Sequence, residues 1–461
     1  MDETMKKIMS LAKRRGFVFP SSEIYGGVEA LWDFGPLGAQ MKQNIKREWF
    51  SRFVQQMDNV VALDSTILMH PDVWKASGHV ENFTDPLIEC KSCNSRFRAD
   101  HMIDGRFVGQ GEAKEPNQCP ECGDRDFTPA KHFNLMFKTF LGPVEDDSNV
   151  TYLRPETAQG MFVDFKLVQE SMRLKLPFGI AQAGKSFRNE ITTGNFFFRS
   201  REFEIAEIEF FCKPGEDEKW FDFWLNAWEQ FYLDLGLKKE NLRRYEHPKE
   251  SLAHYSKRTV DIEYKFPFGW GELAGVANRT DFDLGQHIKA SGKDLSYRDD
   301  ETLRRGSGQA EKYLPYVIEP TMGIERAMLA LLIDAYEEVK GARTTTTEAA
   351  KESEVVLKLS KKVAPVQVAV FPLVKNKPEV VARAKEVYNM LKEHFFCQYD
   401  EVGAIGRRYR RQDEIGTPFC VTIDFDSLEH NDVTLRDRDT MEQKRISIKE
   451  LVETVRIDFN A

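Results

Sequence analysis

The feature that most constrains the fold of this chain is a pair of apolar segments joined by a short polar loop. The first segment ends with the residues FRNE at 187–190, and the second covers residues 203–211. The ten residues between them, ITTGNFFFRS, are long enough to reverse the chain direction. The pattern therefore predicts an antiparallel hairpin of two strands.

The predicted hairpin places several functional side chains on one surface. Strand side chains alternate between faces, so Arg188 and Glu190 are expected on one face of the first strand. Phe203 and Glu207 are expected on one face of the second strand. An arginine, an aromatic ring and two carboxylates suit a nucleotide whose base is stacked and whose α-phosphate is held by the guanidinium. An ordinary surface hairpin with charge pairs explains the same residues equally well.

A second segment favours the nucleotide interpretation. Residues 319–326, EPTMGIER, lead into a helix whose apolar face includes Ala327, Met328 and Leu331. This spacing predicts Arg326 in the first turn of that helix, where it can hold the far end of a triphosphate.

The remaining pattern of the first two thirds of the chain is typical of an α+β fold. Gly35-Pro36 predicts the start of an amphipathic helix, because proline is tolerated in the first helical turn. Its apolar face recurs every four residues from Leu37 to Phe53. From residue 131 to about 335, short apolar strands alternate with loops and a few helices. This alternation predicts a mostly antiparallel sheet.

Two C-x-x-C pairs predict a metal site. Cys90 and Cys93 are separated by a 25-residue gap from Cys119 and Cys122, which is a typical spacing for tetrahedral zinc. We expect structural zinc, because four thiolates leave no coordination position open for water. The alternative is four buried free thiols. Seven cysteines, an odd count, favour a reducing compartment over a disulfide framework, so a cytoplasmic location is expected.

The last hundred residues predict a separate α/β domain. Residues 341–353 lack an apolar pattern and indicate a loop or linker. A β-branched strand at 366–373, a helix at 378–395 and a strand at 418–425 then follow. The basic run RRYRR at 407–411 is more often a solvated helix face than a nucleic-acid contact. A net charge of −9 does not indicate a polyanionic partner, and no apolar run reaches the roughly 18 residues that span a membrane.

Together these segments resemble a class II aminoacyl-tRNA synthetase. The second motif of that family is matched by F-R-x-E at 187–190 and by R-x3-F-x3-E at 199–207. The third is matched by G-x-E-R at 323–326, and the first by the helix that opens at Pro36. Three motifs in order, with their spacing intact, form a specific signature.

The chain is more closely similar to the homodimeric type of glycyl-tRNA synthetase. The segments that carry this likeness are DFGPLGAQMKQN at 33–44, RPETAQG at 154–160, GELAGVANRTDFDL at 271–284 and GRRYRRQDEIGTPFCVTID at 406–424. The resemblance implies a homodimer that uses ATP with Mg²⁺ to attach glycine to tRNA(Gly). It also implies a catalytic domain at 1–355, with a zinc-binding insertion at 86–130 and a helical insertion at 213–260, and an anticodon-binding domain at 363–461.

The resemblance also assigns roles to individual residues. It implies that Arg188 binds the α-phosphate and the amino-acid carboxylate, that Phe203 stacks on adenine and that Arg326 holds the γ-phosphate. Catalysis is assigned to Arg188, Glu190 and Arg326. The implied ATP site comprises Arg188, Asn189, Glu190, Phe198, Arg199, Phe203, Glu272, Leu273, Gly323 and Arg326, with Glu272 also near magnesium. The implied glycine site comprises Arg98, Glu156, Phe203, Glu207, Arg279, Glu319, Thr321 and Gly323.

One residue departs from the family pattern, and two other functions stay open. The family usually has serine where this chain has Thr321, which keeps the hydroxyl and adds a methyl group. One alternative is a synthetase for another small amino acid, but the glutamates at 156, 207 and 319 favour glycine. A synthetase-like protein that only binds nucleic acid is the other. Such proteins tend to lose the phosphate-binding arginines, and both are present here.

Overall fold

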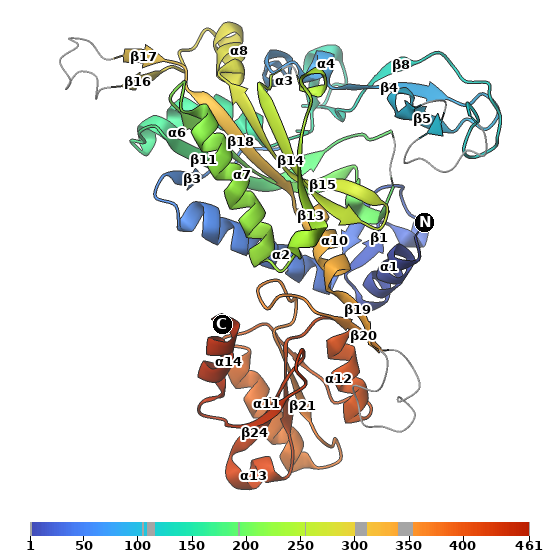
Figure 1. Cartoon of the computed structure of the whole chain (residues 1–461), viewed down its shortest axis with the longest axis vertical. Helices are drawn as coiled ribbons and strands as arrows, with labels where there is room; N and C mark the ends of the chain where they lie inside the picture. Colours follow the sequence, from blue (N-terminus) through green and yellow to red (C-terminus); the bar gives the residue numbers. More distant parts are fainter. Residues whose placement is uncertain are drawn as a thin grey trace.

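The computed structural model describes residues 2–103, 106–107, 116–191, 194–253, 255–299, 311–339 and 354–460. A large body built on a seven-stranded sheet lies above a smaller α/β body that contains the C-terminus (Figure 1). The linker expected at 341–353 lies outside the described residues. Among the described residues, no helix combines the length and apolar character needed to cross a bilayer.

The large sheet is almost entirely antiparallel, as the sequence predicted. The strand order is β13-β14-β15-β18-β12-β11-β3, and only β11 and β3 run parallel. The strands are β3 (Val60–Ala62), β11 (Phe178–Phe187), β12 (Glu202–Cys212), β13 (Leu242–Glu246), β14 (Arg258–Phe266), β15 (Gly269–Thr280) and β18 (Tyr316–Gly323).

The predicted hairpin is formed by β11 and β12, with one correction. Phe187, opposite Glu202, is the last residue of β11. Arg188 and Glu190 were expected on the strand, but they follow its end. The Arg188 backbone N–H still donates to the Arg201 carbonyl, at 2.9 Å, so the hairpin continues for one further residue before the chain turns away.

The two faces of the sheet have different roles because side chains alternate along each strand. On β12, Ala206, Ile208 and Phe210 are buried in the main core, whereas Glu207 and Glu209 lie on the opposite face. Helix α7 (Asp217–Asp234) covers the core face with buried tryptophans. These residues are Trp224 and Trp228, and Trp228 Nε1 donates to the Thr321 carbonyl at 3.1 Å.

The region predicted as a helical insertion, 213–260, is only partly helical. Its first half contains α7. Its second half supplies β13 and leads into β14, and both are strands of the main sheet. The strand character arises because Val260 and Ile262 alternate with polar residues and pack into the main core.

Two helices support the edge of the site. Helix α2 (Pro36–Phe50) begins at the proline that the sequence indicated, and α10 (Ile324–Ala335) follows β18 directly. Their apolar sides join the same core. A buried ion pair also connects them, with Lys42 Nζ 2.6 Å from Glu325 Oε1. Glu325 in turn accepts two hydrogen bonds from the backbone N–H of Glu204, at 3.0 and 2.9 Å.

The cysteine-containing segment forms a small module beside the sheet. Strand β4 (Thr84–Glu89) pairs with β5 (Arg96–Arg98) and with β8 (Lys131–Asn134). Figure 1 shows this module projecting from one side of the large body.

The C-terminal body has the predicted strand–helix–strand order. Its sheet, β22-β21-β23-β24-β25, is parallel across the first three strands and antiparallel across the others. The elements are β21 (Val368–Pro372), α11 (Pro378–Leu391), β22 (Cys397–Tyr399), α12 (Ile405–Asp413), β23 (Phe419–Ile423), α13 (Asp426–His430), β24 (Asp432–Asp437), β25 (Gln443–Ser447) and α14 (Leu451–Asn460).

The chain enters the C-terminal body through a segment that packs on the large one. Strand β20 (Glu354–Leu357) pairs with β19 (Tyr336–Val339). Val363, Ala364 and Val366 then belong to the main core, and the side-chain amide of Asn44 donates to the Ala364 carbonyl at 2.9 Å. The two bodies therefore share packed residues at their junction.

Candidate active site

A cleft of about 920 Å³, including space open to solvent, lies on the face of the sheet opposite α7. Twelve of the residues singled out in the sequence line it: Glu156, Arg188, Glu190, Phe198, Arg199, Phe203, Glu207, Glu272, Glu319, Thr321, Gly323 and Arg326. They come from β12, β15, β18, α10, the residues between β11 and β12, and, for Glu156, the segment before α5 (Ala158–Val163). The fold thus brings together segments that are far apart in the sequence.

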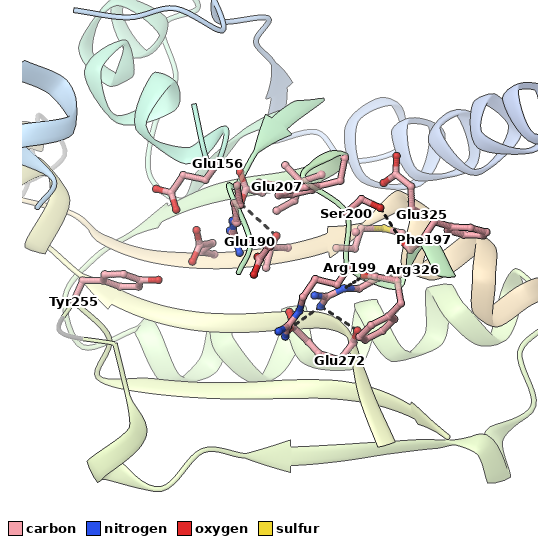
Figure 2. Close-up of a pocket in the computed structure, with 18 residues that line it drawn as sticks. Glu156, Glu190, Phe197, Arg199, Ser200, Glu207, Tyr255, Glu272, Glu325 and Arg326 are labelled. Carbon is pink, nitrogen blue, oxygen red and sulfur yellow. Dashed lines mark hydrogen bonds and ion pairs between the residues drawn. The ribbon is translucent and has the colours of Figure 1, made fainter. Parts of the chain in front are cut away.

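The cleft has two chemically different ends. Figure 2 shows Glu156 and Tyr255 toward one end, and Arg199, Glu272 and Arg326 toward the other. Arg326 Nη1 lies 2.9 Å from Glu272 Oε2, and its guanidinium stands 4.6 Å above the Phe198 ring. Arg326 is therefore held in place in the first helical turn, as the sequence predicted.

Arg188 lies between two aromatic rings. The centre of its guanidinium is 5.4 Å from the ring of Phe83 and 5.4 Å from the ring of Phe203. Its Nε donates to the Pro155 carbonyl at 3.2 Å. Among the described residues, the cation–π contacts and this one backbone bond fix the plane of the group and leave other N–H donors available for an anion in the cleft.

Arg199 adds a third positive charge. Burial lowers the pKa of Arg199, and the nearby Arg326 lowers it further, whereas the charges of Glu190 and Glu272 oppose the change. Three guanidinium groups and two acidic side chains therefore line the same region. An anion with several negative charges, accompanied by a divalent cation, is complementary to this arrangement.

Buried acidic residues form the floor of the other end. Glu156, Glu207 and Glu319 are 7%, 2% and 5% exposed, so all three are withdrawn from water. Glu207 accepts hydrogen bonds from the backbone N–H of Thr157, at 2.6 Å, and from the Thr157 hydroxyl. The Thr321 hydroxyl also donates to Glu207, at 3.4 Å.

Arg279 neutralises part of this charge from below. Its Nε and Nη2 donate to the two oxygens of Asp283, at 2.8 and 2.9 Å, and Nη1 donates to Glu319 at 2.7 Å. The carboxylates of Asp283 and Glu319 outweigh burial and raise the pKa of Arg279 well above its usual value. Its guanidinium also lies 3.9 Å from the centre of the Tyr255 ring.

The glutamates respond to burial in different ways. Burial, together with the charges of Glu207 and Glu156, raises the pKa of Glu319 to about 8 despite Arg279. Burial and the charge of Glu156 also raise the pKa of Glu207. Burial acts on Glu156 as well, but the charge of His79, 3.4 Å away, holds its pKa below the usual value.

Four of the implied site residues do not line the cleft. Arg279 lies beneath the floor, and Leu273 is fully buried in the main core. The backbone N–H of Asn189 donates to the Leu135 carbonyl at 2.7 Å. Arg98, on the cysteine module, pairs with Asp85 and Asp100, each at 2.7 Å.

The structure adds residues that the sequence did not single out. Phe197, Ser200, Ile205, Tyr255, Met322 and Glu325 line the cleft, and His79, Gln159, Glu209 and Asp283 lie behind its floor. Strand alternation could have identified Glu209, because it lies on the same face of β12 as Glu207. His79 had none, because it reaches Glu156 from a helix 77 positions earlier in the chain.

The four cysteines converge as their spacing predicted. The Sγ atoms of Cys90, Cys93, Cys119 and Cys122 all lie within 4.8 Å of one another. The Sγ–Sγ distances for Cys90–Cys122 and Cys93–Cys119 are both 3.6 Å, close to the about 3.8 Å edge of a tetrahedron with Zn–S bonds of 2.3 Å.

Matching turns position these cysteines. In each C-x-x-C pair the residue after the second cysteine donates its N–H to the carbonyl of the first, at 2.8 Å for Asn94 and 2.9 Å for Gly123. Both residues have positive φ, +58° and +80°, which asparagine and glycine tolerate best. The donor set and its geometry fit zinc.

Comparison with protein families identifies two matching regions. Residues 142–336 match the tRNA synthetase class II core domain (G, H, P, S and T), and residues 367–457 match an anticodon binding domain.

Full-length relatives are also found. The chain is 55% identical to a glycine–tRNA ligase of Caldanaerobacter subterraneus subsp. tengcongensis, over 97% of both chains. It is 55% identical to a glycine–tRNA ligase of Streptomyces coelicolor, over 96% of both chains. A glycine–tRNA ligase of Thermobifida fusca is 52% identical, over 97% of this chain and 96% of the relative.

Proposed function

The chain belongs to the glycine–tRNA ligases, a family of class II aminoacyl-tRNA synthetases, and we propose how its residues divide this reaction among them. The activity joins glycine to tRNA(Gly) at the expense of ATP. The observation that carries the division is the two-ended cleft, with guanidinium groups at one end and three buried glutamates at the other.

The arginine end binds ATP. Arg188 holds the α-phosphate together with the amino-acid carboxylate, Phe203 stacks on adenine, and Arg326 holds the γ-phosphate. Glu272 stands beside Arg326, where it would hold Mg²⁺ bound to the phosphates. The secondary contacts to ATP that the family resemblance implies come from Asn189, Glu190, Phe198, Arg199, Leu273 and Gly323. Leu273 is fully buried, so its contact is limited to the backbone.

The first chemical step is attack of the glycine carboxylate on the α-phosphorus, which displaces pyrophosphate. Negative charge develops on the phosphate oxygens, and fixed guanidinium groups stabilise that charge better than water does. The second step is attack of a tRNA terminal hydroxyl on the carbonyl carbon of glycyl-adenylate. This step depends chiefly on positioning, so no protein nucleophile is required.

The glutamate end binds the glycine ammonium. Glu156, Glu207 and Glu319 surround it, and Thr321 limits the space beside the α-carbon. Selecting glycine requires only the exclusion of larger side chains, because no smaller amino acid competes. Rejecting a substrate that is one methylene smaller is difficult, because the two substrates differ in binding free energy by only about 1–3 kcal/mol. This problem does not arise for glycine.

Amino-acid-dependent exchange of pyrophosphate into ATP tests this division. We expect exchange with glycine and at least 100-fold slower exchange with alanine or serine. Faster exchange with alanine or serine would assign the site to another amino acid. A lack of exchange with all three, by a protein that still binds tRNA, would favour the nucleic-acid-binding alternative.

The four-cysteine cluster is proposed to hold structural zinc. Four thiolates complete a tetrahedron, so no position remains for catalytic water. The metal would fix the turns at residues 90–94 and 119–123. Cys119→Ser should abolish stoichiometric zinc in the purified protein, and the control Cys397→Ser, in the C-terminal body, should retain it. Undiminished zinc in the Cys119 variant would refute the site.

The chain is proposed to function as a homodimer. The connection between β1 (Val18–Pro20) and β2 (Trp32–Phe34) exposes large apolar side chains, with Ile24 and Tyr25 exposed by 89% and 86% and Val28 by 48%. Contiguous exposed apolar residues of this kind are typical of interaction surfaces. Ile24→Asp should shift the mass measured by light scattering to that of a monomer, and a wild-type mass equal to one chain would contradict the dimer.

A further inference from the structure

A buried carboxyl group beneath the cleft has no hydrogen-bond partner. Glu209 is fully buried, and neither of its oxygens has a partner in the part of the chain that the structure describes. It lies two residues beyond Glu207 on the same face of β12. A buried polar group of this kind is rare and calls for a physical explanation.

The neighbouring cation, Arg279, already has other hydrogen-bond partners. The Nε and Nη2 atoms of Arg279 bind Asp283, and its Nη1 binds Glu319. Arg279 therefore provides charge near Glu209 without donating a hydrogen bond to it. An ionised carboxylate that is withdrawn from water and lacks a donor is strongly disfavoured, so Glu209 is a neutral acid.

The charge balance of the surrounding cluster indicates that a second carboxyl group, besides Glu209, carries a proton. Five buried carboxyl groups gather around one guanidinium: Glu156, Glu207, Glu209, Glu319 and Asp283. Glu156 has His79 and Gln159 as partners, and Glu207 has Thr157 and Thr321. Glu319 shares Arg279 with Asp283, which engages that guanidinium through both oxygens. With Glu209 neutral, Glu319 receives one of the three guanidinium hydrogen bonds and Asp283 receives the other two, so the carboxylates of the cluster outnumber the cation that they share.

We propose that the empty site holds one proton on Glu319 and another on Glu209, and that binding of the glycine ammonium expels the Glu319 proton into solvent while Glu209 keeps its own. This inference rests on the proposed function, because it requires the ammonium to sit against Glu156, Glu207 and Glu319. The Glu319 carboxylic acid becomes a carboxylate plus a solvated proton, and the ammonium remains charged.

The groups facing Glu319 support this exchange. Glu207 and Glu209 act from β12, Arg279 from β15, and Asp283 from α8 (Phe282–Ser291). Glu156 acts from the segment before α5 (Ala158–Val163), and Tyr255 from the loop before β14. Arg279 is the permanent cation in contact with Glu319, and Arg188, which lines the same cleft, acts on Glu207. His247, Asp261 and Glu272 line a second hollow together with Glu319. Burial raises the pKa of Glu319 to about 8 in the empty site, and an adjacent ammonium would lower it.

The direction of the pH dependence follows from this exchange. Below the pKa of the empty site, binding must remove a proton, so the affinity for glycine increases with pH by about tenfold per unit. Above about pH 8 Glu319 is already ionised, and the increase levels off.

Calorimetry with the full-length protein tests the inference. Glycine is titrated at about pH 6.5 in buffers that differ in ionisation enthalpy, and we expect close to one proton released per glycine bound. Glycolate, which has a hydroxyl in place of the ammonium, should release none. Glycine binding without proton release, and with a pH-independent affinity, would overturn the inference but leave the proposed function intact. Failure to bind glycine would count against the proposed function instead.

Difference infrared spectroscopy identifies the group that loses the proton. Addition of glycine to the wild-type protein should remove one protonated-carboxyl band. Glu209→Gln should show the same loss, because the Glu209 proton is not exchanged and the amide is also neutral. Disappearance of the difference band in Glu209→Gln, with glycine still bound, would make Glu209 the releasing group and overturn the assignment to Glu319.

Discussion

Buried charge is arranged differently in the two bodies of this protein. In the C-terminal body, Arg436 makes two hydrogen bonds of 3.0 Å to the two oxygens of Asp413, and both side chains are almost fully buried. In the large body, one buried guanidinium, Arg279, is surrounded by more carboxyl groups than it can neutralise. One cluster is balanced, and the other is not.

The difference indicates which cluster of buried charges stabilises the fold and which one binds a ligand. A buried ion pair with matched charges requires no charged ligand to balance it, so its role is to connect secondary-structure elements, here α12 and β24. An excess of buried carboxylates is costly in the absence of ligand, and a cation supplied by the substrate relieves that cost. We therefore interpret the unbalanced cluster as the binding site and the balanced pair as structural.

Removing the cation of the unbalanced cluster should give the largest effect. Arg279→Met releases Glu319 and Asp283 from their common partner and misplaces the glutamates around the ammonium. We expect glycine-dependent pyrophosphate exchange to fall by at least about 100-fold. Exchange is measured at a temperature where circular dichroism shows the variant to be folded. Exchange within a few-fold of wild type would show that the cluster is not the binding site.

Removing the cation of the balanced pair should affect stability instead. Arg436→Met leaves Asp413 buried and unpaired, which should cost about 3–5 kcal/mol in the free energy of unfolding of the C-terminal body. Chemical denaturation followed by circular dichroism gives this value. Glycine activation by the folded protein should persist, and its loss would mean that the two bodies are coupled more tightly than their separate cores indicate.

Replacing both partners of one ion pair in each cluster sharpens the comparison. The double variant Asp413→Leu with Arg436→Met should recover stability to within about 1–2 kcal/mol of wild type, because an apolar pair can substitute for a balanced buried ion pair. The matched double variant Glu319→Leu with Arg279→Met should remain inactive in exchange, whatever its stability. Recovery of exchange would assign a purely structural role to the Arg279–Glu319 pair.

The smallest effect is expected on the exposed side of α12. Arg408 is buried and donates to the carbonyl oxygens of Pro372 and Gly403, and Arg411 pairs with Asp400, so these cations are engaged within the protein. Arg407 is exposed. If α12 contacts tRNA, Arg407→Ala should raise the KM for tRNA a few-fold and reduce its salt dependence, with glycine activation unchanged. An unaltered KM for tRNA would exclude Arg407 from the contact.

The sequence predicted the parts of the site that depend on local periodicity. Alternation along β12 placed Phe203 and Glu207 on one face, and the apolar pattern after Gly323 placed Arg326 in the first helical turn. Matched C-x-x-C spacing predicted the cysteine cluster. These signals extend over only a few residues, so tertiary contacts did not override them.

Other parts of the site depend on contacts between distant segments. His79 reaches Glu156 from helix α4 (His79–Asn82), 77 positions earlier in the chain, so it has no local signature. The sequence pattern also did not predict that Arg408, within the basic run, is buried. A helix that packs on β21 through Tyr409 also buries the adjacent arginine.

The most direct test of the central claim is the structure of the protein with an unreactive analogue of glycyl-adenylate. We predict that the ammonium nitrogen lies within hydrogen-bonding distance of Glu156, Glu207 and Glu319, with Arg188 on the phosphate-mimicking group. An ammonium placed away from these three carboxylates, or an empty space beside it large enough for a branched side chain, would contradict the account.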